Sequence, residues 1–440
     1  MPRKLEKFGP LLGWLALALG IALRLYHLGT SSLDIDEMVS VGFAHHESWR
    51  GLMSDTNPPL FLLLLRGWIQ IFPPTEFWLR FPSFVFSVAS LILMSRIGWI
   101  PTLLLALTPA SVQAAQWCRG NSLWEFATVL SLYGLLKSQR LTSLTGLVIA
   151  SLTHWFATFI NVGTVSLGIK TKSNLWRAGL ISLLALIFFA AVFAGLQRAS
   201  FHLDWQIMRF RGVPLLTDAK QQLIEICGGW AVALMIIFFL GWNWKNNFKE
   251  NNRASWSICL SLIFGLLLIV LSLSTERSLF LSRYMTPFVP LFAWSGAVLI
   301  VNAPTHRVVR LMATAFWVGC LLLGTKAYFD RPTPRWRDAL KKAVELQVKT
   351  LWTTRPVGIA HPYLQDTDVR VRNFQGTRIN TEDLIESLKL GRTAIIENYW
   401  GGLLYLAPTR EYLHSRGFKT EELVYSEGTD EPLQLLIIDP

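Results

Sequence analysis

Long apolar runs alternate with short polar breaks from the N-terminus to about residue 325. A helix needs about 20 consecutive apolar residues to cross a bilayer. Hydrophobic residues make up 52% of the chain and its mean hydropathy is +0.38, which is typical of polytopic membrane proteins. The runs that predict membrane-spanning helices cover residues 10–28, 79–95, 98–115, 121–136, 178–197, 225–242, 257–274, 284–301 and 309–327.

The positions of the basic residues settle two ambiguous runs. Residues 142–169 suit one long helix or two short ones, and 58–72 is short for a crossing. Lys and Arg gather in cytoplasmic loops, and the basic residues ahead of the first run place the N-terminus in the cytoplasm. Most basic loops fall on that side if 142–169 crosses twice and 58–72 does not cross. We therefore predict about eleven spans, with 35–50 and 58–72 as helices at the outer interface.

This topology predicts an integral membrane protein whose outer, non-cytoplasmic face carries most of its polar chemistry. No small-x-small cleavage site follows the first run, so we expect its helix to be retained. The outer segments are the loop 29–78, residues 117–122, the tip 153–156, the loop 198–224, the turn 275–283 and the C-terminal region.

Beyond residue 327 the pattern becomes that of a soluble α/β domain. We therefore divide the chain into a helical membrane domain, 1–327, and an extracytoplasmic domain, 328–440. Helical periodicity covers 334–349, and a second helix begins at Asn380/Thr381 and ends at Gly391. The predicted strands are 357–361, 369–374, 393–397 and 433–438.

The net charge of +12 lies in the membrane domain, since residues 328–440 are close to neutral. The Lys/Arg bias of cytoplasmic loops accounts for most of this excess, and attraction to an anionic lipid or phosphate accounts for the rest. The soluble region has no basic stripe, so a nucleic-acid partner is not expected.

Carboxylates are scarce before residue 328, yet five lie between residues 33 and 65. Asp36 and Glu37 follow the first apolar run closely, where a low dielectric favours a general base or a metal ligand. Asp55 precedes Asn57 and a double proline that makes a rigid entry into the next apolar run. A solvated loop pair at Asp36-Glu37 and a simple Asx turn at Asp55 remain the alternatives. The five carboxylates are Asp34, Asp36, Glu37, Glu47 and Asp55.

Basic and aromatic residues on the predicted outer face are candidates for substrate binding. Arg119 and the Arg283-Tyr284 pair lie at span ends, where a guanidinium binds a lipid-linked phosphate or extends to the headgroups. Arg209 and Arg211 lie in the loop 198–224, which is either a substrate clamp or a plain connection.

Neither a metal nor a cofactor is fixed by the sequence. Asp36, Glu37 and Asp55 offer oxygen ligands that suit Mg²⁺ or Mn²⁺, whereas the histidines show no strong zinc pattern. His154, at the tip 153–156, is either a hydrogen-bonded structural residue or a ligand.

A series of short motifs follows the first apolar run in a fixed order. They are Asp36-Glu37, Asp55-Thr56-Asn57-Pro58-Pro59, Leu79-Arg80-Phe81-Pro82-Ser83, Leu107-Thr108-Pro109, Arg119, Leu152-Thr153-His154-Trp155 and Ser282-Arg283-Tyr284 with Pro287 and Pro290. In this order and spacing, the chain resembles the GT-C glycosyltransferases over roughly residues 10–327. It is most similar to their family 39 branch, which contains protein O-mannosyltransferases and the lipid A aminoarabinose transferase.

The resemblance implies an enzyme of a bacterial inner or plasma membrane. It would transfer a hexosyl or pentosyl group, with inversion, from a polyprenyl-phosphate carrier to a lipid, glycan or protein acceptor. By position, Asp36 matches the motif's catalytic acid or base, Glu37 its partner and Asp55 the second acidic position, while Arg119 and Arg283 suit the donor phosphate. Asn57 departs from the family, which often has His before the paired prolines.

Three other functions remain open from the sequence. A flippase or transporter of lipid-linked glycans would place ionisable groups within its spans and show internal repeats. A non-catalytic scaffold would tolerate the loss of both Asp36 and Asp55. A ligase would move whole glycans rather than one sugar.

Overall fold

The computed structural model divides into two compact units, each described by itself. The helical unit comprises Met1–Tyr26, Met53–Leu64 and Arg80–Asp330, and the mixed unit comprises His27–Leu52, Leu65–Leu79 and Arg331–Pro440. The residues that the structure describes are 3–45, 58–154, 157, 215–242, 285–303, 305–331, 335–353, 361–364, 367–373, 381–398, 406–425 and 433–440.

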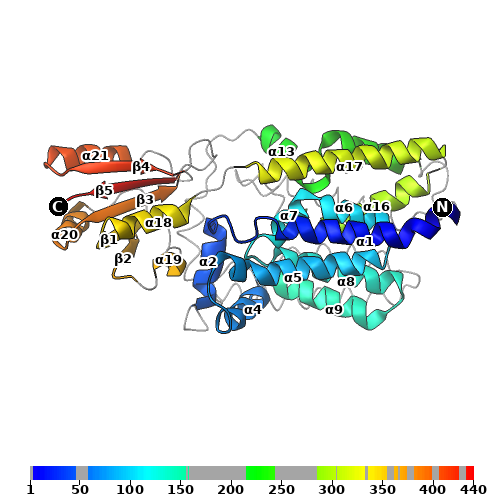
Figure 1. Ribbon diagram of the computed structural model, residues 1–440, viewed down its shortest axis with the longest axis horizontal. Helices are drawn as coiled ribbons and strands as arrows, with labels where there is room; N and C mark the ends of the chain where they lie inside the picture. The colour runs from blue at the N-terminus through cyan, green and yellow to red at the C-terminus, as the bar shows by residue number, and fades with distance from the viewer. Residues whose placement is uncertain are drawn as a thin grey trace. The chain divides into compact units, whose positions relative to one another are not determined.

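Apolar helices make up the described part of the helical unit (Figure 1). Helix α6 contacts both α1 and α16, and α8 contacts both α9 and α16. The helices are α1 (Arg3–Leu25), α6 (Trp99–Leu107), α7 (Pro109–Ala115), α8 (Asn121–Leu136), α9 (Arg140–Thr153), α13 (Leu215–Cys227), the helix Trp230–Trp242, α16 (Phe288–Val301), α17 (Arg307–Phe329), most of α5 (Glu76–Ser95) and the start of α4 (Leu60–Ile69).

Two of the expected spans contain a break in the helix, and whether each crosses the membrane as one span stays a prediction. The run 98–115 divides into α6 and α7 because Thr108 is extended and Pro109, which has no N–H, begins the second helix. The run 225–242 bends by 58° where α13 ends. Gly228 and Gly229 make that bend, with φ values of 94° and 118° that favour glycine.

The prediction of an irregular loop over 198–224 was wrong in its last part, because α13 begins at Leu215. Helices α2 (Ile35–His45) and α4 occupy the two segments expected to be short interfacial helices. Helix α9 ends at Thr153, so 142–169 is not one long helix. Within the described ranges, two helices are long and apolar enough to cross a membrane, or three if the bent pair forms one span. The count of eleven spans therefore stays a prediction.

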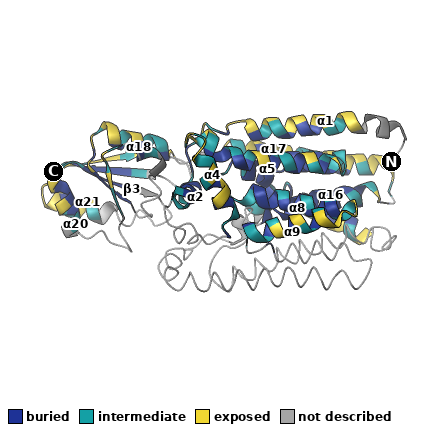
Figure 2. Cartoon of the chain, turned by 90° about the horizontal axis from the view of Figure 1, so that it is seen from below, coloured by how far each residue is buried: buried dark blue, intermediate teal, exposed yellow. Residues whose placement is uncertain are grey.

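Large apolar side chains are exposed on the outside of the helical unit, as expected of helices that face lipid. On α1, Leu11, Trp14 and Leu15 are exposed, and on α17 Met312 and Leu323 are exposed (Figure 2). Apolar surface of this extent is rare on soluble monomers and is typical of a membrane-facing surface.

The side chain of Arg24, which is fully buried, caps the carboxyl end of α6. Because Pro109 interrupts the helix, the last carbonyls of α6 lack their usual donors. The Arg24 guanidinium donates to the carbonyl oxygens of Leu105 and Ala106, at 3.3 and 3.1 Å, and Thr325 Oγ1 donates to that of Leu107 at 2.6 Å. A cation at this helix end also opposes the negative end of the helix dipole.

Ser111 joins Arg24 to Glu125, a buried carboxylate on α8. Arg24 Nη2 donates to Ser111 Oγ at 2.6 Å, and that hydroxyl donates to Glu125 Oε1 at 3.0 Å. Arg24 Nε also donates to Ser87 Oγ of α5, at 2.7 Å. Four helices therefore meet at one buried network of opposite charges, which is retained in a low dielectric because each charge balances the other.

Other helix ends in this unit are completed in the same manner by side chains from a different helix. Within a membrane no water is present to accept or donate these hydrogen bonds, so a partner must come from the protein. Gln116 Nε2 donates to the carbonyls of Leu23, Arg24 and Tyr26 at the end of α1, Trp317 Nε1 to that of Cys227 at the end of α13, and Arg310 Nη1 to that of Val301 at the end of α16.

The C-terminal part of the mixed unit is built on a five-stranded sheet of order β2-β1-β3-β5-β4. Strands β2, β1 and β3 are parallel, and β5 runs antiparallel to both β3 and β4. Helices α20 and α21 share a buried apolar cluster with β1, β3 and β5. The elements are α18 (Trp336–Glu345), β1 (Thr350–Thr353), α19 (His361–Leu364), β2 (Arg370–Asn373), α20 (Thr381–Lys389), β3 (Thr393–Asn398), α21 (Leu406–Ser415), β4 (Thr420–Val424) and β5 (Leu433–Ile438).

The α/β prediction for this region is confirmed in part. The strands expected at 369–374, 393–397 and 433–438 form β2, β3 and β5. Of the strand expected at 357–361, residues 357–360 lie outside the described residues, and His361 begins α19 and does not end a strand. Strands β1 and β4 and helix α21 were missed. Residues 27–52 and 65–79 belong to the same compact unit as this sheet. The division into domains at 327/328 stays a prediction.

We predict that Arg24→Met lowers the free energy of unfolding by about 3–5 kcal/mol, because it leaves Glu125 unbalanced and removes the guanidinium donors from the end of α6. Thermal unfolding of the full-length protein in detergent would measure this loss. Arg24→Met/Glu125→Leu removes the unbalanced carboxylate as well, so the double variant should lose less than the single one.

The control is Arg307→Met, since Arg307 is an exposed residue in the first turn of α17. Its effect should stay within about 0.5 kcal/mol. An Arg24→Met protein as stable as the Arg307→Met protein would contradict the capping role.

Candidate active site at the amino end of α2

Helix α2 begins with a capping box, which fixes the positions of the two predicted catalytic acids. Asp34 is the N-cap: its Oδ1 accepts from the backbone N–H of Asp36 at 2.6 Å. Glu37 Oε2 accepts in return from the backbone N–H of Asp34 at 2.8 Å. Such reciprocal bonds satisfy two donors at the helix start. The carboxylates of Asp34 and Glu37 therefore hold the backbone that carries Asp36.

Apolar residues on both sides of the box reinforce it. Leu33 precedes the cap and Met38 follows Glu37, which are the positions of a hydrophobic staple, and both side chains are buried. Glu37 is fully buried, whereas Asp36 is only half-buried. Asp36 lies in the first turn, where the helix dipole favours a carboxylate. The described structure thus presents Asp36, on a rigid helix start, as the accessible member of the acid pair.

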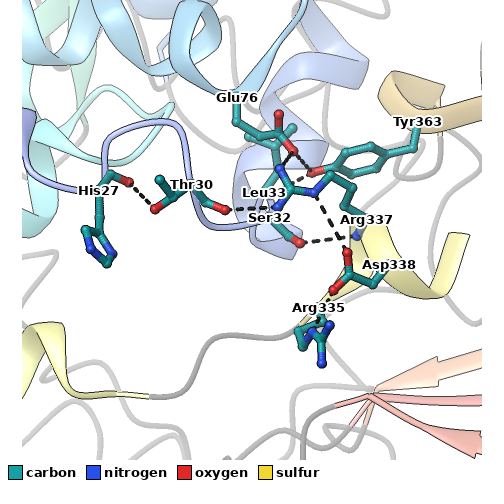
Figure 3. Close-up of polar contacts among 9 residues, drawn as sticks. All are labelled: His27, Thr30, Ser32, Leu33, Glu76, Arg335, Arg337, Asp338 and Tyr363. Carbon is teal, nitrogen blue, oxygen red and sulfur yellow. Dashed lines mark hydrogen bonds and ion pairs between the residues drawn. The ribbon is translucent and has the colours of Figure 1, made fainter. Parts of the chain in front are cut away.

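The segment before α2 is held by residues of the C-terminal region (Figure 3). Arg337 of α18 and Tyr363 of α19 both hydrogen-bond to Glu76 Oε1, at 3.1 and 3.3 Å. Arg337 also donates to the Thr30 carbonyl at 3.0 Å, and the Tyr363 hydroxyl accepts from the Leu33 N–H at 2.8 Å. All five residues belong to the mixed unit.

Aromatic rings fix the segment that carries Glu76. Phe72 stacks between Trp68 and Trp78, with ring centroids 4.0 and 4.6 Å apart. Trp68 Nε1 donates to the Trp78 carbonyl at 2.8 Å. Pro82, four residues later in α5, cannot donate to that carbonyl, so the indole replaces the missing helix bond.

Two further predicted site residues lie in the helical unit. Arg119 lies in the turn between α7 and α8, and its carbonyl accepts from Ser83 Oγ at 3.1 Å. His154 follows the end of α9 and stacks on the buried Trp124, with centroids 4.1 Å apart and planes 8° apart. This stacking gives His154 a structural role, and a ligand role for it stays a prediction.

The structure brings Asp36 and Glu37 together on one helix turn, and it leaves the remaining candidates untested. Within the described ranges, no group of three or more His, Cys, Asp or Glu side chains could hold a metal ion, so Mg²⁺ or Mn²⁺ also stays a prediction. The candidates outside the described residues are Asp55, Asn57, Arg209, Arg211, Arg283 and Tyr284.

Several residues that support the candidate site or the helical unit were not predicted from the sequence. Glu125 falls inside the predicted span 121–136 and Arg24 inside 10–28, and opposite charges within two spans are a signal that could have paired them. Arg337 and Tyr363 had no such signal, because both are ordinary residues of a soluble region.

Neither a protein-family model nor a curated protein sequence matches the chain. Solved structures match it over nearly its whole length, and they show which known proteins share its fold. The matching structures include two of ArnT from Cupriavidus metallidurans. The one in the apo state has 12% sequence identity and a TM-score of 0.57, over 97% of this chain and 98% of that chain. The one bound to undecaprenyl phosphate has 11% identity and a TM-score of 0.55, over 96% and 98%.

At these identities the similarity is one of fold, and it confirms the fold expected from the motif order. ArnT is the lipid A aminoarabinose transferase, a member of the same branch that the sequence resembles.

We predict that Glu37→Ala lowers the free energy of unfolding by about 1 kcal/mol more than Glu37→Gln, because glutamine can still accept the Asp34 N–H and alanine cannot. Thermal unfolding in detergent would compare the two variants with the wild type. Equal losses would show that the capping bond contributes nothing to stability.

Proposed function

We propose that the chain is a membrane glycosyltransferase. It takes a sugar from a polyprenyl-phosphate-linked donor and transfers it to a lipid, glycan or protein acceptor at the outer face of the membrane. The observation that carries this proposal is the fold shared with ArnT, one of whose structures holds undecaprenyl phosphate. The capping box that fixes Asp36 supports it.

In the proposed reaction, Asp36 acts as the general base. It takes the proton from an acceptor hydroxyl or amine, and the acceptor attacks the anomeric carbon from the face opposite the phosphate. The bond from that carbon to the phosphate oxygen breaks, and the polyprenyl phosphate leaves with the electron pair. The configuration at the anomeric carbon is therefore inverted.

The remaining candidates would bind the donor and the acceptor. Arg119 and Arg283 are proposed to stabilise the negative charge of the leaving phosphate, because a guanidinium binds two phosphate oxygens at once. Asp55 is proposed to support the base. A Mg²⁺ or Mn²⁺ ion, if Asp36, Glu37 and Asp55 hold one, would add positive charge at the same phosphate. The other proposed substrate-binding residues are Tyr284, His154, Asn57, Arg209 and Arg211.

One observation favours the alternative of a transporter. Arg24 and Glu125 are ionisable residues buried beside a broken helix, and such helices line the substrate sites of many transporters. In this chain, however, Arg24 and Thr325 take the carbonyls that such a break would offer to a substrate. The hydrogen-bonding groups at the break are therefore already occupied by residues of the chain. Transport is the second candidate function.

We predict that Asp36→Asn lowers the rate of sugar transfer by a factor on the order of 10²–10⁴, because the amide cannot take the acceptor proton. The assay uses membranes that contain the full-length variant, with transfer from an isolated lipid-linked sugar followed by mass spectrometry. Asp330→Asn is the control, since Asp330 is a largely exposed residue at the end of α17. Undiminished transfer by the Asp36→Asn protein would exclude Asp36 as the base.

We also predict that cells without the chain accumulate a polyprenyl-phosphate monosaccharide, because its consumer is missing. Mass spectrometry of extracted carriers, with and without the gene, would identify the sugar. Accumulation of a whole lipid-linked glycan would instead indicate a ligase or flippase, and unchanged carriers would contradict the transferase proposal.

Repeating the transfer assay with a chelator, and then with added Mg²⁺ or Mn²⁺, tests whether transfer depends on a metal ion.

A further inference from the structure

Arg337 binds the segment that leads into α2 at three points. Its Nη1 pairs with Glu76 Oε1 at 3.1 Å, its Nη2 donates to the Thr30 carbonyl at 3.0 Å, and its backbone N–H donates to Ser32 Oγ at 3.2 Å. The guanidinium plane therefore spans α5 and the segment 27–34 from a third element, α18 (Figure 3). Such a fixed fork of donors holds its partners in one geometry, which a flexible ammonium would not do.

Tyr363 makes the contact nearest to the acid pair. Its hydroxyl accepts from the N–H of Leu33, the residue directly before the capping box, and donates to Glu76 Oε1. The hydroxyl thus has a donor on one side and an acceptor on the other, which fixes its orientation. Leu33 is three residues before Asp36, so a shift at Leu33 is passed to the start of α2.

Glu76 is the common acceptor of these contacts and is well shielded. Its side chain is 13% exposed and that of Arg337 is 30% exposed. Bonds to an ionised carboxylate are stronger than neutral ones, and they are stronger still where water is excluded. Gly29 also lies so close to Phe77 that a Cβ on it would meet the Phe77 Cβ at 2.8 Å. The segment 27–34 therefore packs closely against the start of α5.

We propose that Arg337 and Tyr363 are positioning residues for Asp36. They act through Glu76 and the segment 27–34. In this way the C-terminal region helps to position the proposed catalytic base. Helix α2 has 11 residues, too few for a stable isolated helix, so its direction depends on what holds its ends. Misplacement of a base by about 1 Å lowers a rate on the order of 10²-fold. The inference rests on the proposed transferase function.

The kinetic test uses full-length Arg337→Met and Tyr363→Phe proteins in membranes. We expect kcat to fall on the order of 10- to 100-fold, with the KM for the lipid-linked donor changed less than about twofold, because the contacts direct the base and do not bind donor. Arg337→Lys keeps the charge and should recover part of kcat.

Matched controls come from the same region. Arg410→Met breaks the ion pair between Arg410 and Glu422, whose atoms are 2.8 Å apart, and Tyr412→Phe removes a hydroxyl on α21. Both should leave kcat and KM as in the wild type. A rise in KM with kcat unchanged would overturn the proposal, because the residues would then bind substrate.

Hydrogen–deuterium exchange of residues 27–45 gives a readout that does not depend on activity. We expect faster exchange of this segment in Arg337→Met and Tyr363→Phe, and no change in Arg410→Met. Faster exchange with unchanged kcat would overturn the positioning role, and so would unchanged exchange in both variants.

The two readouts separate this inference from the proposed function. If wild-type membranes transfer no sugar, the transferase proposal fails. The exchange data then still decide whether Arg337 and Tyr363 hold the start of α2. Tyr363→Phe removes only one oxygen atom. If the Arg337→Met protein fails to fold, the kinetic and exchange tests are therefore made with Tyr363→Phe.

Discussion

Unsatisfied backbone carbonyls at helix ends are the constraint on which the helical unit depends. In a bilayer no water completes them, and each one left without a donor costs several kcal/mol. The chain meets this constraint by sending a side chain from one helix to the end of another. Arg24 of α1 completes α6, and Gln116, after α7, completes α1. Helix α1 therefore caps α6 and is itself capped by Gln116, so the ends of these helices depend on one another.

The break at Pro109 removes hydrogen bonds within one helix and replaces them with hydrogen bonds between helices. A continuous helix over 98–115 would need no such donors, and the Arg24 guanidinium would lose its carbonyl acceptors at the end of α6. With the break, its guanidinium donates to the carbonyls of Gly20, Leu105 and Ala106 and to the hydroxyls of Ser87 and Ser111. Glu125 balances the charge through Ser111. The break at Pro109 thus provides carbonyl acceptors for Arg24, and Arg24 provides the donors that the break removes.

In the mixed unit, the same kind of long-range bond reaches the proposed catalytic helix. The capping box of α2 is local and would form in many contexts, since Asp34 and Glu37 are three residues apart. What it cannot fix is where the helix start lies. That depends on the contacts of Glu76 with Arg337 and Tyr363, which lie 261 and 287 residues further along the chain. The C-terminal region shares a compact unit with residues 27–52, so its contacts bear on the position of Asp36.

The sequence by itself determined the features that depend on local pattern: apolar helices up to residue 325, an α/β region after it, and an acid pair at a helix start. Periodicity and composition encode these directly. Tertiary structure decided the break at Pro109, the bend at Gly228, the burial of Arg24 with Glu125, and the contacts of Arg337. Each depends on a partner distant in sequence, and one chain read alone does not show which distant residues meet. The positions of strands β1 and β4 were missed for a related reason, since a short strand is defined by its neighbours in the sheet more than by its own residues.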